Sequence, residues 1–360
     1  MFFLAPAFSP RAARAQDAAP PPPTPGAGAL AKTLAEVRQA FGLSGFFDVQ
    51  GADSGTDPSV FSMGDLEVDL ARDLGSHVQV AAALVVNGEG ARLAVGFVDV
   101  HVAGATVAPR GRLPVEEGFH VQLGRFDLPF GGDWPYFAAK DRTEISAPLT
   151  TDLVLDGGGN DVGLRLLGTG ESLGWSAWWT RGEGKGTAVG GRVAFTPFDN
   201  VYRLRERVRA FELGVSGLLD LDGGGATETA FLAVDAELRG PIGRLRAEWV
   251  RRDERAAEGR TTRLVRSGLH VTAFIDAGTV AGVPLTPYVR WDTAKAGPDG
   301  PDGGIATGRT ERLTAGLNGL LLDILTLKLE YQRGLSAPAE AEAGEGSRRD
   351  AVLAQAVVTF

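Results

Sequence analysis

Few residues in this chain have the types and spacing that an enzyme active site or a metal centre requires. The run from Gly170 to Gly174 matches the G-x-S-x-G pattern of a serine nucleophile. That pattern needs a turn from a strand into a helix, and the flanking residues here predict a strand on each side. The four histidines, at positions 77, 101, 120 and 270, show no ligand spacing such as H-E-x-x-H. We therefore predict no enzyme activity, no metal ion and no cofactor, and we expect His101 and His270 to face a polar interior.

The charged residues that alternate with apolar ones carry more information. From Leu43 onward the hydrophobic period is two, which is typical of strands with one apolar and one polar face. Val98, Val100 and Val102, for example, alternate with Asp99 and His101. By this alternation the polar faces are acidic on early strands (Asp65, Glu67, Asp69, Asp99) and largely basic on later ones (Arg239, Arg244, Arg246, Arg252, Arg266, Arg290, Arg312).

The length of these segments favours a transmembrane antiparallel β-barrel over a soluble sandwich. Many segments reach roughly 9 to 13 residues, which is enough to cross a bilayer at a tilt. Aromatic residues cluster near strand ends, as in interfacial girdles: Phe46, Phe47, Trp178, Trp179, Phe195, Phe198, Tyr288, Trp291 and Tyr331. The last strand has an alternating apolar face that ends on Phe360, which resembles the assembly signal of outer-membrane barrels.

The pattern predicts about sixteen strands, an even number as single-chain bacterial barrels require. The expected strands are 43–52, 61–71, 77–87, 91–103, 118–126, 161–168, 173–181, 188–196, 209–220, 229–239, 243–253, 262–275, 286–293, 309–320, 325–334 and 350–360. Connections alternate between short turns and long loops, with exceptions at 87–90, 104–117 and 197–208. The longest, 127–160, is the third on the long-loop rim, and we expect it to fold inward.

At that loop the chain resembles a known family. The run Val121-Gln122-Leu123-Gly124-Arg125-Phe126-Asp127-Leu128-Pro129-Phe130-Gly131 is similar to the strand-to-loop signature of the phosphate-selective porins O and P. The resemblance extends loosely over residues 40–360 and implies a general porin that assembles as a homotrimer. That family has lysine-rich constrictions, whereas this loop contains one lysine, Lys140.

We expect the pore lining and constriction to combine arginines of the later strands with carboxylates of the loop. The predicted residues are Arg239, Arg244, Arg246, Arg266, Arg290, Arg312, Asp133, Asp141, Glu144 and Asp152. One hypothesis is a transverse field in which loop carboxylates face an arginine wall and orient polar solutes. The alternative is that these charges pair with each other and only keep the lumen wet.

The first 42 residues differ in composition from the rest. Residues 1–10 are apolar and the following run ends in Ala13-Arg14-Ala15, so residues 1–15 suit a signal peptide, and the missing basic n-region suggests that it is truncated. Residues 16–42 combine a proline-rich linker with a short amphipathic helix marked by Leu30, Leu34, Val37 and Phe41. The barrel would then span 43–360.

The bulk composition restricts the partners. A net charge of −9 argues against a nucleic-acid binder, and the absence of cysteine excludes disulfides and thiolate metal sites. The sequence predicts an outer-membrane porin of a Gram-negative bacterium that passes small hydrophilic solutes or ions. Expected partners are outer-membrane lipid, lipopolysaccharide and, through Phe360, the barrel-assembly machinery. The alternative is a closed barrel with a structural or adhesive role at the cell surface.

Overall fold

The computed structural model describes residues 42–53, 60–104, 117–181, 186–197, 210–221, 229–255, 263–280, 282–299, 308–336 and 350–360. The predicted signal peptide, linker and amphipathic helix lie outside these residues. The strands are β1 (Leu43–Asp53), β2 (Val60–Asp73), β3 (Val78–Asn87), β4 (Gly90–Ala103), β5 (Gly118–Asp127), β6 (Asn160–Thr169), β7 (Leu173–Arg181), β8 (Thr187–Phe195), β9 (Ala210–Asp220), β10 (Thr229–Gly240), β11 (Gly243–Arg255), β12 (Arg263–Ile275), β13 (Thr279–Val280), β14 (Val283–Asp299), β15 (Gly308–Leu321), β16 (Leu325–Ser336) and β17 (Asp350–Thr359).

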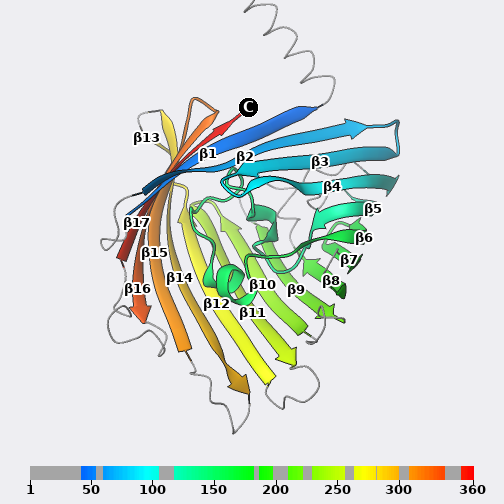
Figure 1. The fold of residues 1–360 in the computed structure, drawn as a ribbon. Coiled ribbons are helices and arrows are strands. Elements are labelled where there is room, and N and C mark those ends of the chain that lie inside the picture. The colour runs from blue at the N-terminus through cyan, green and yellow to red at the C-terminus, as the bar shows by residue number, and fades with distance from the viewer. Residues whose placement is uncertain are drawn as a thin grey trace, which may run out of the picture. The chain divides into compact units, whose positions relative to one another are not determined.

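Sixteen of these strands form a closed antiparallel barrel (Figure 1). Each strand pairs with its sequence neighbour, and β1 closes the barrel by pairing with both β2 and β17. The closure extends to the last residue, because Gly45 and Phe360 exchange backbone hydrogen bonds of 3.0 and 3.1 Å. β13 adds only a two-residue ladder with the start of β14. The prediction of an all-β barrel of about sixteen strands is therefore confirmed.

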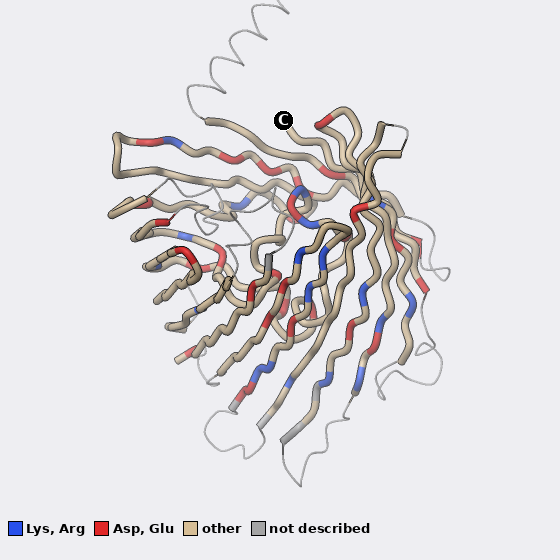
Figure 2. Tube along the Cα trace, turned by 180° about the vertical axis from the view of Figure 1, so that it is seen from behind, with Lys and Arg blue, Asp and Glu red and all other residues tan. Residues whose placement is uncertain are grey.

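The alternating pattern separates an apolar exterior from a polar interior. Val98, Val100 and Val102 of β4 are 40–58% exposed, whereas Asp99 between them is fully buried. Leu329 of β16 is exposed in the same way, and its neighbour Glu330 is fully buried. Charged residues recur along the strands throughout the barrel wall (Figure 2). A surface that is apolar outside and charged inside suits a barrel whose solvent is lipid on the outer face.

The aromatic girdle predicted at the strand ends is partly wrong. Trp179, Phe195 and Tyr331 lie on the exterior, at 42–49% exposure. Phe46, Trp178 and Tyr288 are buried in the interior. Where two aromatics are adjacent in sequence, as at 178–179, the period of two sends one to each face of the wall.

One rim of the barrel has short turns, namely residues 74–77, 170–172, 241–242 and 322–324, and we call it the short-turn rim. The other, the long-loop rim, includes the 128–159 segment. The G-x-S-x-G run falls at the β6–β7 turn, between two strands, and so lacks the helix that a nucleophile elbow needs. β14 is longer at both ends than the predicted 286–293. No helix among the described residues is long and apolar enough to cross a membrane.

Candidate functional site: a loop across the barrel lumen

The segment 128–159 leaves β5, crosses the interior of the barrel and returns to β6 (Figure 1). It contains a short 3-10 helix (Trp134–Tyr136) and a π-helical turn (Thr150–Val154). The segment is called the lumen loop below. Its entry depends on Gly131, which has a φ of +71°, and a side chain there would meet the Glu248 carboxylate. The Gly131 amide donates to Ser216 Oγ at 3.0 Å and the Gly132 amide to Glu248 Oε2 at 3.2 Å. The loop thus docks on β9 and β11 immediately after it leaves β5.

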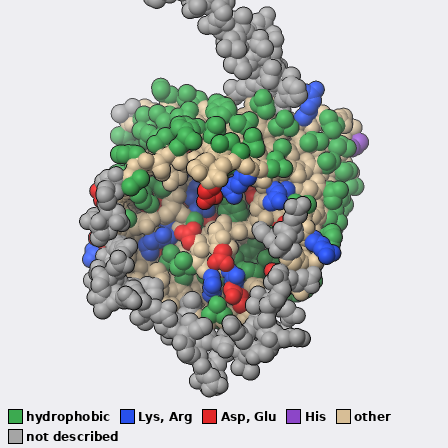
Figure 3. Space-filling view, in the orientation of Figure 1, with side chains coloured by type: hydrophobic (Ala, Val, Ile, Leu, Met, Phe, Trp, Pro, Cys, Tyr) green, Lys and Arg blue, Asp and Glu red, His purple; other side chains and the backbone are tan. Residues whose placement is uncertain are grey.

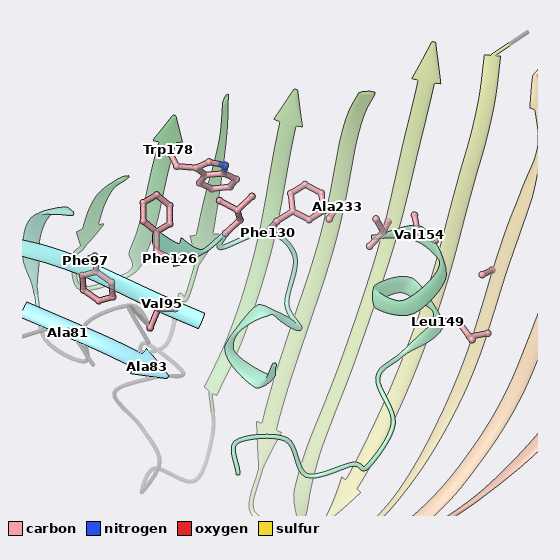
Figure 4. Packing of buried hydrophobic residues seen from close by; sticks show 13 residues of the cluster. Ala81, Ala83, Val95, Phe97, Phe126, Phe130, Leu149, Val154, Trp178 and Ala233 are labelled. Carbon is pink, nitrogen blue, oxygen red and sulfur yellow. The ribbon is translucent and has the colours of Figure 1, made fainter. Parts of the chain in front are cut away.

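Apolar side chains of the lumen loop are buried against apolar positions of the inner wall (Figure 4). Leu128, Phe130, Leu149 and Val154 are each at most 6% exposed. Their cluster includes the wall residues Ala81, Ala83, Val95, Phe97, Phe126, Trp178, Ala233, Val250 and Ala294. This apolar strip gives the loop a preferred place to pack, and smaller apolar contacts of Trp134 with Leu167 and of Ala138 with Phe46 and Val357 add to it.

The predicted arginines Arg246 and Arg290 meet the lumen loop directly. Arg246 Nη1 lies 3.9 Å from Asp133 and 4.0 Å from Glu144, and its guanidinium lies 3.9 Å from the centre of the Tyr136 ring. Arg290 lies 3.9 Å from Glu144 and donates to the Ser146 carbonyl at 2.9 Å and to Ser146 Oγ at 2.7 Å. Both arginines are at most 2% exposed. The structure therefore brings wall arginines and loop carboxylates into contact.

Glu144 is the centre of this contact. Its side chain is 2% exposed, and burial on its own would raise the pKa of the carboxyl group. The nearby charges of Arg246, Arg290 and Arg142 outweigh burial and hold that pKa below its ordinary value. The carboxylate is thus kept ionised by the cations around it.

Two further predicted arginines bind the backbone and hydroxyl groups of the loop. Arg312 donates to the Ala147 carbonyl at 2.6 Å and to Asp292 at 3.2 Å. Arg244 donates to Thr143 Oγ1 at 3.2 Å. The other two predicted arginines lie away from the loop's centre, since Arg266 pairs with Asp156 at 3.1 Å and Arg239 with Glu237 at 3.3 Å.

The remaining predicted carboxylates differ in environment. Asp133 accepts from Arg142 Nη2 and from Thr151 Oγ1, both at 2.8 Å, and so braces the loop internally. Asp141 is half-buried and interacts with other groups of the protein. Asp152 is exposed to a cavity, yet partial burial raises the pKa of its carboxyl group.

Opposite the arginine sector, the loop presents a cation to the acidic strands. Lys140 pairs with Asp69 and lies 3.6 Å from Glu67 on β2. Its ammonium group also lies 5.5 Å from the centre of the Phe46 ring. The single lysine of the loop is therefore fully engaged with the wall.

Several wall residues that hold the loop were not among the predicted site residues. Glu330 accepts from the amides of Ile145 and Ser146 at 3.0 and 3.3 Å. Lys328 donates to the carbonyls of Ala139 and Arg142 at 2.7 and 2.8 Å. Asp292 accepts from the Leu149 amide at 3.1 Å, and His270 Nδ1 lies 2.9 Å from Thr150 Oγ1. Alternation placed all four inside the barrel, and only the docked loop distinguishes them from other inward polar residues.

The space left beside the loop forms two adjoining cavities. A larger one, of about 750 Å³, lies between the loop and the β2–β6 wall and is lined by Asp65, Arg92, Arg125, Asp127 and Asp156 among others. A smaller one, of about 240 Å³, is lined by Asp48, Gln50, Arg142, Asp152 and Gln355 among others. Both include Asp65, Phe137 and Gly157. Figure 3 shows charged side chains gathered in the hollow of this face. These two cavities thus border the acidic strands.

No protein-family model matches the chain, and no curated protein matches it. Solved structures do resemble it. An anion-selective porin from Comamonas acidovorans has 15% sequence identity and a TM-score of 0.61, with 88% of this chain and 98% of that chain covered. OmpT, an outer-membrane protein of Vibrio cholerae, has 9% identity and a TM-score of 0.60, with 88% and 97% covered. The outer membrane channel DcaP of Acinetobacter baumannii has 12% identity and a TM-score of 0.57, with 88% and 96% covered. The chain therefore shares the closed-barrel fold of these outer-membrane proteins.

Proposed function

We propose that this protein is an outer-membrane porin of a Gram-negative bacterium that gives passive or weakly selective passage to small hydrophilic solutes or ions. One observation carries the proposal. A closed barrel with an apolar exterior encloses a charged lumen, and a firmly docked loop narrows that lumen while leaving polar cavities beside it. A pore needs such a polar, hydrated interior.

We infer that the arginine sector acts by fixing the loop. Arg246 and Arg290 are buried beneath it, whereas the cavities are bordered by Asp48, Asp65, Asp127, Asp152 and Asp156 and by Arg92, Arg125 and Arg142. Acidic side chains outnumber basic ones along this path. A mild cation preference follows, because the charge that lines a passage sets which ions enter it.

We propose a relationship to the phosphate-selective porins O and P, supported by the 121–131 run at the point where β5 becomes the lumen loop. Phosphate selectivity based on a loop lysine is not part of this proposal. Lys140 is the one lysine of the loop, and Asp69 and Glu67 already neutralise it.

We further propose assembly as a homotrimer in contact with outer-membrane lipid and lipopolysaccharide. One similar solved structure, OmpT of Vibrio cholerae, is described as a trimer form. Phe360 is 47% exposed at the short-turn rim, where the barrel-assembly machinery could bind it.

The test is single-channel recording of the detergent-purified protein in a planar lipid bilayer, with the reversal potential measured under a salt gradient. Stable conductance steps with a mild cation preference are expected. The variant Asp65→Asn should reduce that preference, and Glu311→Gln, at the outer end of β15, serves as the matched control. A barrel that shows heat-modifiable migration on gels but conducts no current would refute the porin and favour a closed structural or adhesive protein.

A further inference from the structure

Three side chains with metal-binding chemistry meet on the inner wall of β4 and β5. Asp99 and His101 lie two residues apart on the same face of β4, and His120 lies on β5. His101 and His120 are direct cross-strand partners. The sequence separates the two histidines by 18 intervening residues, so no local spacing indicates the cluster.

The potential ligand atoms converge on one point. His101 Nε2 lies 2.9 Å and His120 Nδ1 lies 3.0 Å from the same oxygen, Asp99 Oδ2. One possible ligand atom from each of the three residues lies within 4.8 Å of those of the other two. Metal–nitrogen and metal–oxygen bonds of about 2.0–2.2 Å place neighbouring ligands about 3 Å apart. The side chains therefore already lie at the spacing that a small divalent ion demands.

Hydrogen bonding alone accounts poorly for this arrangement. Asp99 and His120 are fully buried and His101 is 5% exposed. Among the described residues, Asp99 Oδ1 and His120 Nε2 have no hydrogen-bond partner, and His101 Nε2 lies 2.9 Å from Asp99 Oδ2 without forming a hydrogen bond to it. Two imidazoles thus crowd one carboxylate oxygen while the other oxygen stays unused. Buried polar groups are normally satisfied, and an ion bound between Asp99 Oδ2, His101 Nε2 and His120 Nδ1 would engage His101 Nε2, which the protein leaves without a hydrogen bond.

The surroundings permit a cation. Arg165 of β6, on the same wall, donates to Gln122 Oε1 at 2.9 Å and to the Asp127 carbonyl at 3.0 Å. Asp127 ends β5 at the long-loop rim, whereas Asp99 lies nearer the short-turn rim.

We propose that Asp99, His101 and His120 bind one divalent transition-metal ion on the luminal wall. Neutral imidazoles with one carboxylate suit zinc, nickel or copper rather than calcium or magnesium, which prefer oxygen ligands. Three protein ligands leave coordination positions for water or a passing solute. The ion would join β4 to β5 near the short-turn rim and add positive charge to the lumen.

The experiment uses the full-length folded barrel in detergent, freed of metal with a chelator and titrated with Zn²⁺ alone in a calorimeter. One Zn²⁺ per chain is expected for the wild type, with saturating Ca²⁺ leaving the titration unchanged. The double variant H101A/H120A should lose this binding. The matched control H77A removes an exposed histidine outside the cluster and should bind as the wild type does.

A second measurement needs no variant. Co²⁺ added to the metal-free wild type should give visible d–d bands with intensities typical of nitrogen ligation, and Zn²⁺ should abolish them. Absence of a stoichiometric site in the correctly folded wild type would overturn the proposal, as would undiminished Zn²⁺ binding by folded H101A/H120A. These readouts do not involve conductance, so they are independent of whether the porin proposal stands.

Discussion

Replacing Arg290 with alanine should release the lumen loop from the wall of an otherwise intact barrel. Arg290 is fully buried and binds the loop at Ser146 O, at Ser146 Oγ and, at 3.2 Å, at the Ala147 carbonyl. It also donates to Asp292 at 3.0 Å and lies 3.9 Å from Glu144. R290A therefore removes three loop hydrogen bonds and leaves two buried carboxylates with less positive charge nearby, since Arg246 and Arg312 remain.

The size of the effect follows from these contacts. Two opposite unit charges about 4 Å apart interact by about 4 kcal/mol at the effective dielectric constant of protein sites. Removing one partner of a buried pair typically costs about 3–5 kcal/mol, because the other charge stays desolvated. Glu144 regains water if the loop lifts away, whereas the strand ladders of the barrel do not depend on it. About 4 kcal/mol corresponds to about a thousandfold shift toward the undocked loop.

Trypsin reports on loop docking. Its targets in the loop are Lys140, which is engaged with β2, and Arg142, which is 8% exposed and bound to Asp133. The folded wild type should resist cleavage there, and R290A should be cut while its barrel remains heat-modifiable on gels. Single-channel conductance should rise and become noisier.

Two variants control this experiment. R309A removes an exposed arginine paired with Glu311 and should behave as the wild type, because exposed ion pairs contribute little. R290A combined with Glu144→Gln should recover part of the protection, since position 144 then carries no charge that depends on Arg290. Unchanged cleavage and conductance in folded R290A would refute the view that arginines hold the loop.

Three further predictions concern pH and a turn. Because the pKa of Asp152 is raised, the side chain should lose its charge at a pH higher than the ordinary carboxyl pKa of 3.8. Reversal potentials measured during acidification should therefore show a fall in cation preference, and Asp152→Asn should remove that step. The pKa of Glu144 is lowered in the folded protein, so the carboxylate should stabilise the docked loop fully above pH 4.5. This stabilisation should be lost only as the pH falls through the lowered pKa of the folded state. A rise in conductance from loop release near neutral pH would contradict this. Leu322 and Asp323 have φ values of 55° and 60° at the centre of the β15–β16 turn, a conformation that asparagine and glycine adopt at lower cost. L322N/D323G should therefore stabilise the barrel by about 1–2 kcal/mol in urea unfolding. No gain in stability would count against strain in this turn.

Sequence alternation predicted the strands well because lipid on the outer face and water on the inner face impose it. Each strand needs apolar residues on one face and polar residues on the other, and this requirement repeats at every second position. It failed mainly at β14, which runs from Val283 to Asp299 and so extends beyond both ends of the predicted 286–293. In the structure Pro287 pairs with Leu317 of β15 within the ladder. A proline is tolerated where its nitrogen is not needed as a donor, and sequence alone does not show which side that is.

The candidate site was predictable only in part, because its contacts are long-range. Alternation identifies Arg246 and Arg290 as inward, but their common partner Glu144 lies more than a hundred residues before either of them in the chain, in a loop without periodicity. The same limit hid the Asp99 cluster, which depends on the register between β4 and β5. Pattern determines the face of each residue, whereas register and loop docking determine its partner.

The charges of the loop and the wall together explain why the loop lies in one orientation. The loop carries a cation at Lys140 and anions at Asp133 and Glu144, and the wall is acidic on β2 and basic on β11 and β14. Rotating the loop to the opposite wall would bring Lys140 toward arginines and Glu144 toward Glu67 and Asp69, which is unfavourable in a partly desolvated interior. The apolar strip adds packing energy but does not by itself favour one orientation of the loop. Charge complementarity at both ends therefore selects which side of the lumen is filled, and the polar space that remains lies along the acidic strands.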